Sequence, residues 1–462
     1  MVAFPNLTLN VTPPGGGTTN YAANLVWDGS SQAISITQNF GRQGDTAIFT
    51  LVDEYNATPH FYIPVLSQIA FIDNTINTTL FAGVVNDPIL LVTGSNRNEW
   101  ILNCTDYTFY ADNADVQGTF NDLSVDRILV ALTNEANCGI SAVLRSSGGY
   151  VYPAPVLTQA QLSWGTLSSA WRSLAQLAGS STPYGWYVDE NRRLHFFDSS
   201  TAVNSGVTFT TAPTVAGSTT EGHIALDTTF GYEWDGTTIH NKIIVQGANQ
   251  TIYSSVTKTP TDTWRADGTQ TAWPLRFTAT GSATLSLNGA RVSVVVNSTG
   301  VASTNAWAIQ QNAFGQWFLV ALHAPGEGTI VRLWYDYQVP VIAQAQETNS
   351  QATYTGPNRG VYSEYINDSS LITVQMALAR ALRERTEYAY AVERATFTVT
   401  EEFIGWVRAG YTFTYVNHFI PDSTSGYSWG LSDTFICTGN TITWGSTHNS
   451  PYRTMSITAV RA

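Results

Sequence analysis

Alternation of apolar and polar residues dominates the chain and predicts β-strands over most of its length. In residues 25–110 the alternating runs are short and are separated by turn-forming residues, a pattern typical of a barrel or a sandwich. The strands predicted in this part are 33–37, 46–52, 68–72, 79–85, 89–92 and 99–105. The chain is therefore expected to begin with a barrel-like β-domain.

Residues 166–198 have a different pattern. Apolar residues recur three and four positions apart over 167–178, which predicts an amphipathic helix with one buried face. Thr166 is placed to cap its start, and Gly179 is placed to end it. Two short apolar runs, 185–188 and 193–197, then flank a polar turn and predict a hairpin. A helix laid on a small antiparallel sheet indicates an α+β domain.

Two further segments follow helical spacing. Residues 122–132 predict a helix that closes the first domain, with Ser124 as a plausible cap. Residues 368–388 form the longest helical pattern, and four charged residues are expected on its outer side: Arg380, Arg383, Glu384 and Glu387. Other strands are predicted at 207–211, 241–247, 395–400, 410–416, 434–438 and 453–460.

The region from residue 253 to residue 346 looks like a self-contained β-sandwich inserted into another domain. Its predicted strands lie between Gly and Asn turns, at 271–275, 283–288, 292–296, 307–309, 317–321 and 329–339. At the other end of the chain, the Pro- and Gly-rich stretch 11–19 makes residues 1–20 look like an N-terminal arm.

Together these patterns predict a mainly β fold with some α. The predicted domains are an arm (1–20), a first barrel-like domain with a closing helix (21–145), a helix-hairpin domain with a second barrel-like domain (146–252 and 347–462), and the inserted sandwich (253–346).

Charge is scarce in this sequence. Only 12% of the residues are charged, and the net charge is −13. Weakly charged surfaces can rest against other proteins at little desolvation cost, which favours a member of a large assembly over a freely diffusing enzyme. The negative balance argues against a basic groove that holds nucleic acid. No signal peptide and no membrane-spanning run is predicted.

The three cysteines are far apart and have no metal-binding spacing. Cys104 and Cys437 lie in strand-like runs, so buried free thiols are expected there. Cys138 is the third. A disulfide has no support in the sequence.

Candidate catalytic groups are few, and each has a simpler structural explanation. Glu401 and Glu402 are adjacent carboxylates, but consecutive strand residues point to opposite faces, so an acid–base pair is not favoured. No pair of histidines has the spacing of a metal site. The histidines are His60, His195, His223, His240, His323, His418 and His448. No catalytic residue, metal or cofactor is therefore predicted.

Two weaker candidates concern binding. The turn 111–115 is rich in Asp and Asn and could hold Ca²⁺, but it lacks a spaced calcium loop, so a solvated turn is favoured. Tryptophans of the inserted sandwich could form sugar-stacking platforms, although core packing is favoured for most of them. They are Trp264, Trp273, Trp307, Trp317 and Trp334.

The order of several passages resembles the baseplate hub or tail-tip hub proteins of tailed bacteriophages. The passages are SITQNFGRQGDTAIFTL (35–51), LFAGVV (80–85), WILNCTDY (100–107), VQGTFNDLSVDRIL (116–129), the helix-hairpin 167–197, the strand 241–247, the helix 371–382, FTVT (397–400) and VRAGYTFTY (407–415). The inserted sandwich and the N-terminal arm have no counterpart in this resemblance.

The resemblance implies a structural virion protein at the tail tip, with no cofactor. It implies a homotrimer in which two pseudo-equivalent barrel-like domains per subunit present a sixfold-like ring to the tail tube or distal tail protein. The opposite, threefold face would carry a central fibre or spike. The lumen would pass the tape measure protein and then DNA, and an acidic chain would let DNA slide without specific binding.

Two alternatives stay open at the level of sequence. A tail-associated glycan or peptidoglycan hydrolase would need two carboxylates facing each other across a cleft, and no spacing in the chain indicates such a pair. A receptor-binding tail protein would grip a surface glycan through tryptophans of the sandwich at 253–346.

Overall fold

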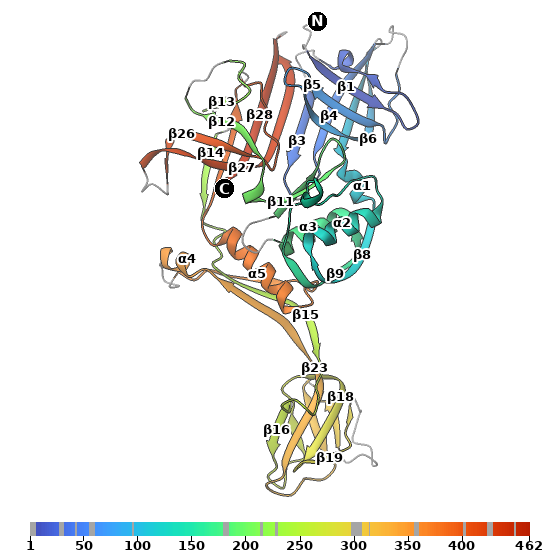
Figure 1. Ribbon diagram of the computed structural model, residues 1–462, viewed down its shortest axis with the longest axis vertical. Helices are drawn as coiled ribbons and strands as arrows, with labels where there is room; N and C mark the ends of the chain where they lie inside the picture. Colours follow the sequence, from blue (N-terminus) through green and yellow to red (C-terminus); the bar gives the residue numbers. More distant parts are fainter. Residues whose placement is uncertain are drawn as a thin grey trace. The chain divides into compact units, whose positions relative to one another are not determined.

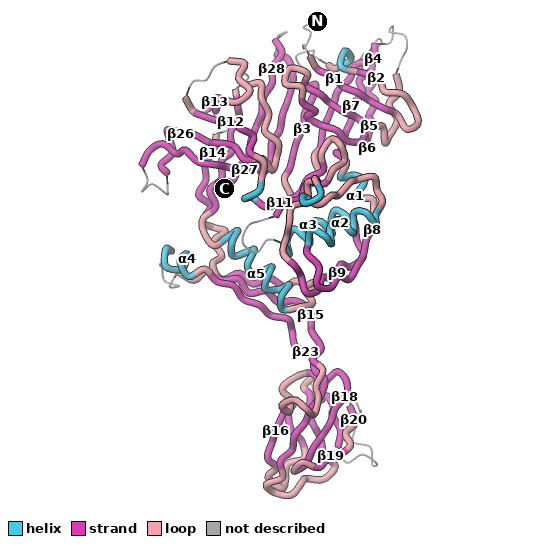
Figure 2. Tube along the Cα trace, in the orientation of Figure 1, coloured by secondary structure: helices cyan, strands magenta, loops and turns pink. Residues whose placement is uncertain are grey.

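The chain forms two compact units in the computed structural model (Figure 1). The structure describes residues 6–26, 32–41, 44–54, 61–94, 97–178, 184–212, 216–226, 230–296, 307–313, 315–354, 360–400, 403–422, 428–447 and 450–462. Unit 1 consists of residues 1–243, 344–364 and 379–462, and unit 2 of residues 244–343 and 365–378. As expected, strands predominate over helices throughout the described residues (Figure 2).

Unit 1 begins with a curled antiparallel sheet. Its strands pair in the order β3-β4-β7-β6-β5-β1-β2. They are β1 (Leu7–Thr12), β2 (Thr19–Asn20), β3 (Gln32–Asn39), β4 (Thr46–Glu54), β5 (Gln68–Asp73), β6 (Thr78–Gly94) and β7 (Arg97–Asp106), with a 3-10 turn at Ala22–Asn24. Along β7, buried residues alternate with half-buried ones, as one covered face of a sheet requires.

A second β-domain of unit 1 closes on itself. Strand pairing runs β25-β13-β12-β26-β27-β28 and returns to β25, and β14 adds to β25 beyond the end of β13. The strands are β12 (Asn204–Thr210), β13 (Glu221–Ala225), β14 (Gly231–Asp235), β25 (Val392–Val399), β26 (Thr412–Asp422), β27 (Ser428–Thr447) and β28 (Ser450–Arg461). Closure leaves the circuit without the open edges that a flat sheet presents.

The two β-domains share one sheet and one core. The long strand β27 pairs with β26 and β28 and also with β3, so hydrogen bonding continues from one domain into the other. Trp444 on β27 packs edge-on against Phe71 of β5, with ring centroids 5.3 Å apart. A single buried cluster runs from Leu9 in β1 to Ala459 in β28. Apolar burial therefore stabilises both β-domains together.

Helices and two two-stranded sheets lie between the β-domains in sequence. They are α1 (Thr108–Asp112), β8 (Asp115–Ser124), α2 (Val125–Ala136), a 3-10 turn (Arg145–Ser147), β9 (Val156–Thr166), α3 (Leu167–Ala178), β10 (Tyr184–Val188), β11 (Leu194–Asp198) and a 3-10 turn (Ser199–Thr201). The predicted helix and hairpin are confirmed. Thr166 accepts a hydrogen bond from the Ser169 backbone N–H at 3.3 Å, while Gly179 lies outside the described residues.

Trp171 anchors α3. Its side chain is fully buried, meets Trp186 of β10 edge-on at 5.2 Å, and donates its Nε1–H to Thr133 of α2 at 3.1 Å. One residue thus joins two helices and the hairpin, and its polar atom is satisfied despite burial.

Unit 2 contains the inserted β-sandwich. One sheet has the order β19-β18-β23-β15-β24 with β16 on β23, and the other has the order β17-β22-β21-β20. The strands are β15 (Lys242–Ile252), β16 (Asp262–Arg265), β17 (Ala272–Pro274), β18 (Thr278–Leu287), β19 (Ala290–Val292), β20 (Val295–Val296), β21 (Trp307–Gln311), β22 (Trp317–Ala321), β23 (Ile330–Gln346) and β24 (Ser363–Asn367). Its core holds Trp273 stacked on Trp307 at 5.5 Å.

Helix α2 differs from its prediction over residues 122–132. Residues 122–124 belong to β8, and the helix runs from Val125 to Ala136. Ser124 makes no side-chain cap; the N–H of Val125 instead donates to the Pro155 carbonyl at 3.0 Å. A hydrogen bond to the distant Pro155 carbonyl therefore replaces the side-chain cap that was expected from Ser124.

The long helix also begins later than predicted. It is α5 (Val374–Tyr388), preceded by the short α4 (Thr348–Thr353). Asp368 accepts a hydrogen bond from the Ser370 backbone N–H at 3.0 Å, which forms a turn instead of a helical start. Thr373 then accepts from the Met376 N–H at 3.2 Å and caps the helix.

Several strands were not predicted from the sequence. Residues 7–12, predicted only as part of an arm, form β1, in which Leu9 and Val11 are buried. Strands β8 and β9 pair with each other and were not predicted. No helix in the described part of the chain is long and apolar enough to cross a membrane.

Gly83 of β6 offers a test of the packing in the first β-domain. A Cβ at this position would lie 2.0 Å from the backbone oxygen of Thr105 in β7. We expect Gly83→Ala to lower the free energy of unfolding by at least about 1–3 kcal/mol, because backbone cannot yield as a side chain can. Chemical denaturation measures the loss.

Gly17→Ala is the matched control, since a Cβ at Gly17 meets no heavy atom within 4 Å. Equal stability of the Gly83 and Gly17 variants would contradict the close approach of β6 and β7.

Candidate functional site

A buried ion pair joins distant parts of unit 1. Arg408, in the segment between β25 and β26, donates from Nη2 to Asp45 Oδ2 at 3.0 Å and to the Val188 carbonyl at 3.1 Å. The side chains of Arg408 and Asp45 are only 7% and 5% exposed. The backbone N–H of Asn39 donates to the other oxygen of Asp45 at 2.9 Å. Both charges are therefore paired where water is excluded.

Rings stack outward from Arg408. Its guanidinium lies 4.3 Å from the centroid of the Tyr187 ring, and Tyr187 stacks on His195 at 4.4 Å with an interplanar angle of 12°. His195 in turn packs on Tyr150 at 4.3 Å, and Arg193 covers Tyr150 at 4.6 Å. The column begins and ends with a cation over an aromatic face, which is an attractive electrostatic arrangement.

Asp189 fixes the outer end of this column. Its Oδ2 accepts from Arg193 Nε at 2.7 Å and lies 3.0 Å from His195 Nε2. Burial acts to raise the pKa of Asp189, but hydrogen bonds from His195 and Arg193 outweigh it and lower that pKa. Burial lowers the pKa of His195, with Asp189 opposing the shift. Burial therefore favours the uncharged form of the imidazole in the column.

A second carboxylate sits beside the ion pair. Asp106, at the end of β7, accepts from the Thr108 backbone N–H at 3.1 Å, and its own N–H donates to the Asp45 carbonyl at 2.9 Å. Burial raises the pKa of Asp106 to about 7, and the negative charge of Asp45 adds to this rise. The positive charge of Arg408 therefore interacts with both the Asp45 and the Asp106 carboxyl groups.

We call this set the polar joint: Asp45, Asp106, Tyr150, Tyr187, Asp189, Arg193, His195 and Arg408. Its members come from the end of β7 and the β3–β4 turn, from the hairpin β10–β11 and its surroundings, and from the entry to β26. The joint consequently links the first β-domain, the helix-hairpin part and the second β-domain within unit 1.

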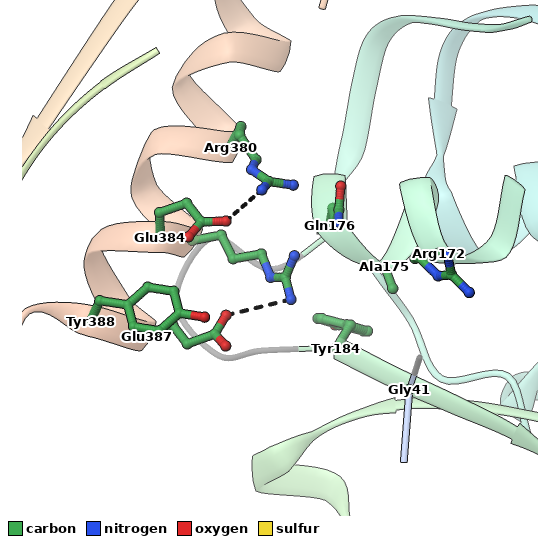
Figure 3. A pocket seen from close by; sticks show the side chains of 10 residues that line it. Gly41, Arg172, Ala175, Gln176, Tyr184, Arg380, Glu384, Glu387 and Tyr388 are labelled. Atoms are coloured by element: carbon green, nitrogen blue, oxygen red, sulfur yellow. Dashed lines mark ion pairs between the residues drawn. The ribbon is translucent and has the colours of Figure 1, made fainter. Parts of the chain in front are cut away.

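A polar pocket of ≈ 370 Å³ lies between α3 and α5 in unit 1 (Figure 3). It is lined by residues of α3, α5, the start of β10 and the β3–β4 turn: Gly41, Arg172, Ala175, Gln176, Tyr184, Arg380, Arg383, Glu384, Glu387 and Tyr388. Figure 3 shows Arg380 projecting from α5 towards Gln176 of α3.

Ion pairs one helical turn apart order the α5 wall of this pocket. Arg380 lies 2.8 Å from Glu384, and Arg383 lies 3.5 Å from Glu387. The four side chains are only 12–23% exposed, so their predicted position on the outer side of the helix was wrong. Helical periodicity separates the faces of α5 but cannot tell which face a neighbouring helix covers. Burial lowers the pKa of Arg383, and Glu387 opposes the shift.

Two hairpin arms expose apolar side chains. In β6, Ile89, Leu90, Leu91 and Val92 are all exposed, Val92 by 76%. This part of β6 pairs with β7, whereas pairing with β5 stops at Val84. In β26–β27, Phe419 and Trp429 are 61% and 75% exposed. Apolar groups gathered on an arm mark a surface suited to protein contact.

The structure describes five of the seven histidines weighed from sequence and neither of the two adjacent glutamates. Glu401, Glu402, His60 and His448 lie outside the described residues. His195 belongs to the polar joint, and His418 bonds Thr211 at 3.1 Å. Within the described ranges, no group of three or more His, Cys, Asp or Glu side chains could hold a metal ion.

The remaining sequence candidates are structural. In the turn 111–115, Asp112 accepts a hydrogen bond from Ser168 of α3. Trp273 and Trp307 are buried in the sandwich core, and Trp264, Trp317 and Trp334 are half-buried. Cys104, Cys138 and Cys437 are free, with Cys104 and Cys437 buried as predicted, and burial raises the pKa of both buried thiols.

Asp106 makes stability depend on pH. Its pKa is about 4 in an unfolded chain and about 7 here, so it stabilises the fold below about pH 4 and loses that contribution as pH rises through about 7. We expect Asp106→Asn to flatten the fall in unfolding free energy across this interval. Chemical denaturation at several pH values measures it.

Asp115→Asn, at an exposed position of β8, is the control and should follow the wild-type pH profile. An Asp106→Asn profile that parallels the wild type would show that Asp106 is not protonated near neutral pH.

Arg408→Lys tests whether the shape of the guanidinium matters beyond its charge. A lysine cannot lie flat on Tyr187 while donating to both Asp45 and Val188. We expect a loss of about 1–3 kcal/mol in unfolding free energy. Arg145→Lys should cost far less, because Arg145 is exposed above Tyr152 at 5.3 Å. Similar losses in both variants would argue against a special role for the joint.

Solved structures with a similar fold are known. No protein-family model and no curated protein matches the chain. The 43 kDa tail protein of prophage MuSo2 from Shewanella oneidensis is similar in structure, with a TM-score of 0.54 and 12% identity over 98% of each chain. The tail protein from Neisseria meningitidis MC58 is also similar, with a TM-score of 0.51 and 9% identity over 99% of this chain and 97% of that one.

Both structural similarities extend over nearly the whole chain. Because the sequence identities are only 12% and 9%, the similarities are evidence for the fold alone. The resemblance to tail proteins that the sequence predicted is confirmed at that level. The chain has the fold of phage-type tail proteins.

Proposed function

We propose that this chain is a structural protein of a phage-type virion tail and acts as the hub of the baseplate or tail tip. The observation that carries the proposal is a fold shared with two tail proteins over nearly their full length. The sheet continuity and the exposed arms of this chain also fit this role.

The continuous sheet of unit 1 fits a hub that must act as one body. Because β27 pairs with β3 as well as with β26 and β28, a load on one β-domain reaches the other through backbone hydrogen bonds. The two β-domains are proposed to be the pseudo-equivalent barrel-like domains. Three subunits would then present six such domains to a sixfold tail tube.

The hairpin arms fit contacts between subunits. Exposed apolar residues sit on an arm of each β-domain: Leu90 and Val92 on β6, and Phe419 and Trp429 on β26–β27. Burying such groups against a second copy would release them from water. We therefore assign the arms to the interfaces of a homotrimer.

The other proposed partners follow from the hub role. They are a distal tail or tail tube protein on one face and a central fibre or spike on the other. The tape measure protein and DNA would pass through the lumen. A chain of net charge −13 would repel phosphate and let DNA slide without specific binding. The domain scheme, with the sandwich at 253–346 as an addition, forms part of the proposal.

Neither alternative function gains a specific observation. The five tryptophans considered for glycan binding are buried or half-buried. The two similar solved structures are of tail proteins.

Native mass spectrometry of the purified chain at several concentrations tests the assembly. We expect a trimer for the wild type, and we expect Leu90→Glu and Trp429→Glu to shift the population towards monomer, since each buries a charge in an apolar interface. Tyr253→Glu is the control, because Tyr253 is 70% exposed on the inserted segment and outside both arms.

A wild-type monomer at every concentration would contradict self-assembly of the free chain. A trimer that tolerates both arm substitutions would remove the arms from the interface while leaving the hub proposal standing.

A further inference from the structure

The inserted sandwich departs from the charge balance of the whole chain. Residues 253–346 contain five Lys and Arg against four Asp and Glu, whereas the net charge of the chain is −13. Two of these four carboxylates are buried and accept hydrogen bonds, Asp262 from the Tyr335 hydroxyl at 2.7 Å and Asp336 from the Ser254 backbone N–H at 2.9 Å. The exposed surface of the sandwich is therefore more positive than its composition alone indicates.

Three of the five positive side chains lie on one face of the sandwich. Strands β16, β23, β18 and β19 are neighbours in one sheet (Figure 1). Their pairing places Thr263, Arg332, Ser286 and Arg291 opposite one another across the four strands. Arg265 lies on the same side of β16 as Thr263, because alternate residues of a strand share a face. The residues between them on β18 and β23 belong to the buried core. We call Arg265, Arg291 and Arg332 the arginine face.

The three side chains of the arginine face are exposed. Among the described residues, none of them has a carboxylate within ion-pair distance; the ion pair of the sandwich joins Arg276 to Asp262 at 3.9 Å. The two exposed carboxylates, Asp267 and Glu327, lie in turns beyond the Arg265 end of the row. The guanidinium groups are therefore available to a partner from outside the chain.

Cross-strand geometry sets the spacing of these arginines. Neighbouring strands lie about 4.8 Å apart, so Arg332 and Arg291, which are two strands apart, have backbones about 10 Å apart. Arg265 lies diagonally from Arg332 on the adjacent strand, at about 7–8 Å. A guanidinium fork matches a carboxylate or phosphate group. The row therefore suits a polymer that carries such groups at intervals rather than one small anion.

The rest of this face favours a hydrated polymer. Its strands all lie in the described ranges, and the hydroxyl side chains of Thr263 and Thr284 lie among the arginines. Ile330, 38% exposed, lies at one edge, whereas a protein interface has an apolar core. Single-stranded nucleic acid needs successive aromatic platforms, and here the half-buried Trp334 is one ring. Anionic membranes are recognised by clusters of about four to eight Lys and Arg, more than this face has.

We propose that the arginine face binds an anionic polysaccharide, a polymer whose sugars carry carboxylate or phosphate groups. The guanidinium groups pair with the oxyanions, and the threonine hydroxyls bond the sugar hydroxyls between them. This recognition depends on charge, and so differs from the tryptophan platforms considered for a surface glycan. The arginine face lies in unit 2 and the hairpin arms lie in unit 1, so polysaccharide binding and the proposed assembly are tested separately.

Biolayer interferometry of the full chain tests the proposal on three dextrans that share one backbone: carboxymethyl-dextran, phosphorylated dextran and unmodified dextran. We expect saturable binding to at least one charged dextran, weakened by added salt, and no binding to the unmodified one. The double variant Arg291→Gln/Arg332→Gln should lower the affinity at least about tenfold, because two charge-assisted contacts are lost.

Arg145→Gln/Arg276→Gln is the matched control, since it removes the same charge from exposed arginines outside the face. It should bind as the wild type does. Equal losses in the two double variants would attribute binding to overall charge and overturn the proposal. Absence of binding to both charged dextrans, or equal binding to unmodified dextran, also overturns it. Tighter binding of poly-L-glutamate than of the charged dextrans would assign an acidic protein partner instead.

A measurement on the wild type avoids dependence on folding of the variants. Phenylglyoxal modifies accessible arginines, and mass spectrometry maps the modified positions. The bound charged dextran should slow modification of Arg291 and Arg332 several-fold while leaving Arg145, an exposed arginine of unit 1, unchanged. Equal modification with and without the dextran would contradict binding at the arginine face.

Discussion

The buried pair of Arg408 and Asp45 constrains how the parts of unit 1 meet. Removing two charges from water is costly, and the cost is offset only when the groups meet each other and other hydrogen-bonding partners. Arg408 satisfies this by reaching Asp45, the Val188 carbonyl and the face of Tyr187 at once. Separating Arg408 from Asp45 would leave a buried charge unpaired, and moving the hairpin away would remove the Val188 carbonyl and the Tyr187 ring from the guanidinium.

Backbone pairing provides the second constraint. The sheet continues from the closed circuit of the second β-domain through β27 into β3, and one apolar cluster lies beneath both. Hydrogen bonds and burial thus act on the same boundary as the polar joint. The continuous sheet and the shared core therefore join the two β-domains within unit 1.

Some of the chain's scarce charges are buried at two places. The polar joint and the pocket between α3 and α5 together contain Asp45, Asp106, Arg408, Arg383 and Glu387, all mostly buried. The hairpin arms, by contrast, expose apolar groups to solvent. Exposed apolar patches of this kind are typical of protein-contact surfaces. The distribution therefore suits a chain whose exposed surfaces become interfaces.

Elements with a local signal could be predicted from the residue pattern. Alternation with period 2 located β4, β5 and β7, and apolar spacing with its Thr166 cap located α3. The order of the passages along the chain also indicated the tail-protein fold. These features depend on neighbours along the chain, which a sequence states directly.

Contacts between distant residues became apparent only in the folded chain. Asp45 and Arg408 are 363 residues apart, and nothing local to either one predicts their pairing. The start of α2 depends on the Pro155 carbonyl, and the buried face of α5 depends on α3 across the pocket. Burial and hydrogen bonding are set by whichever groups the fold brings into contact, so the polar joint, the pocket and the exposed arms appear only once the chain is folded.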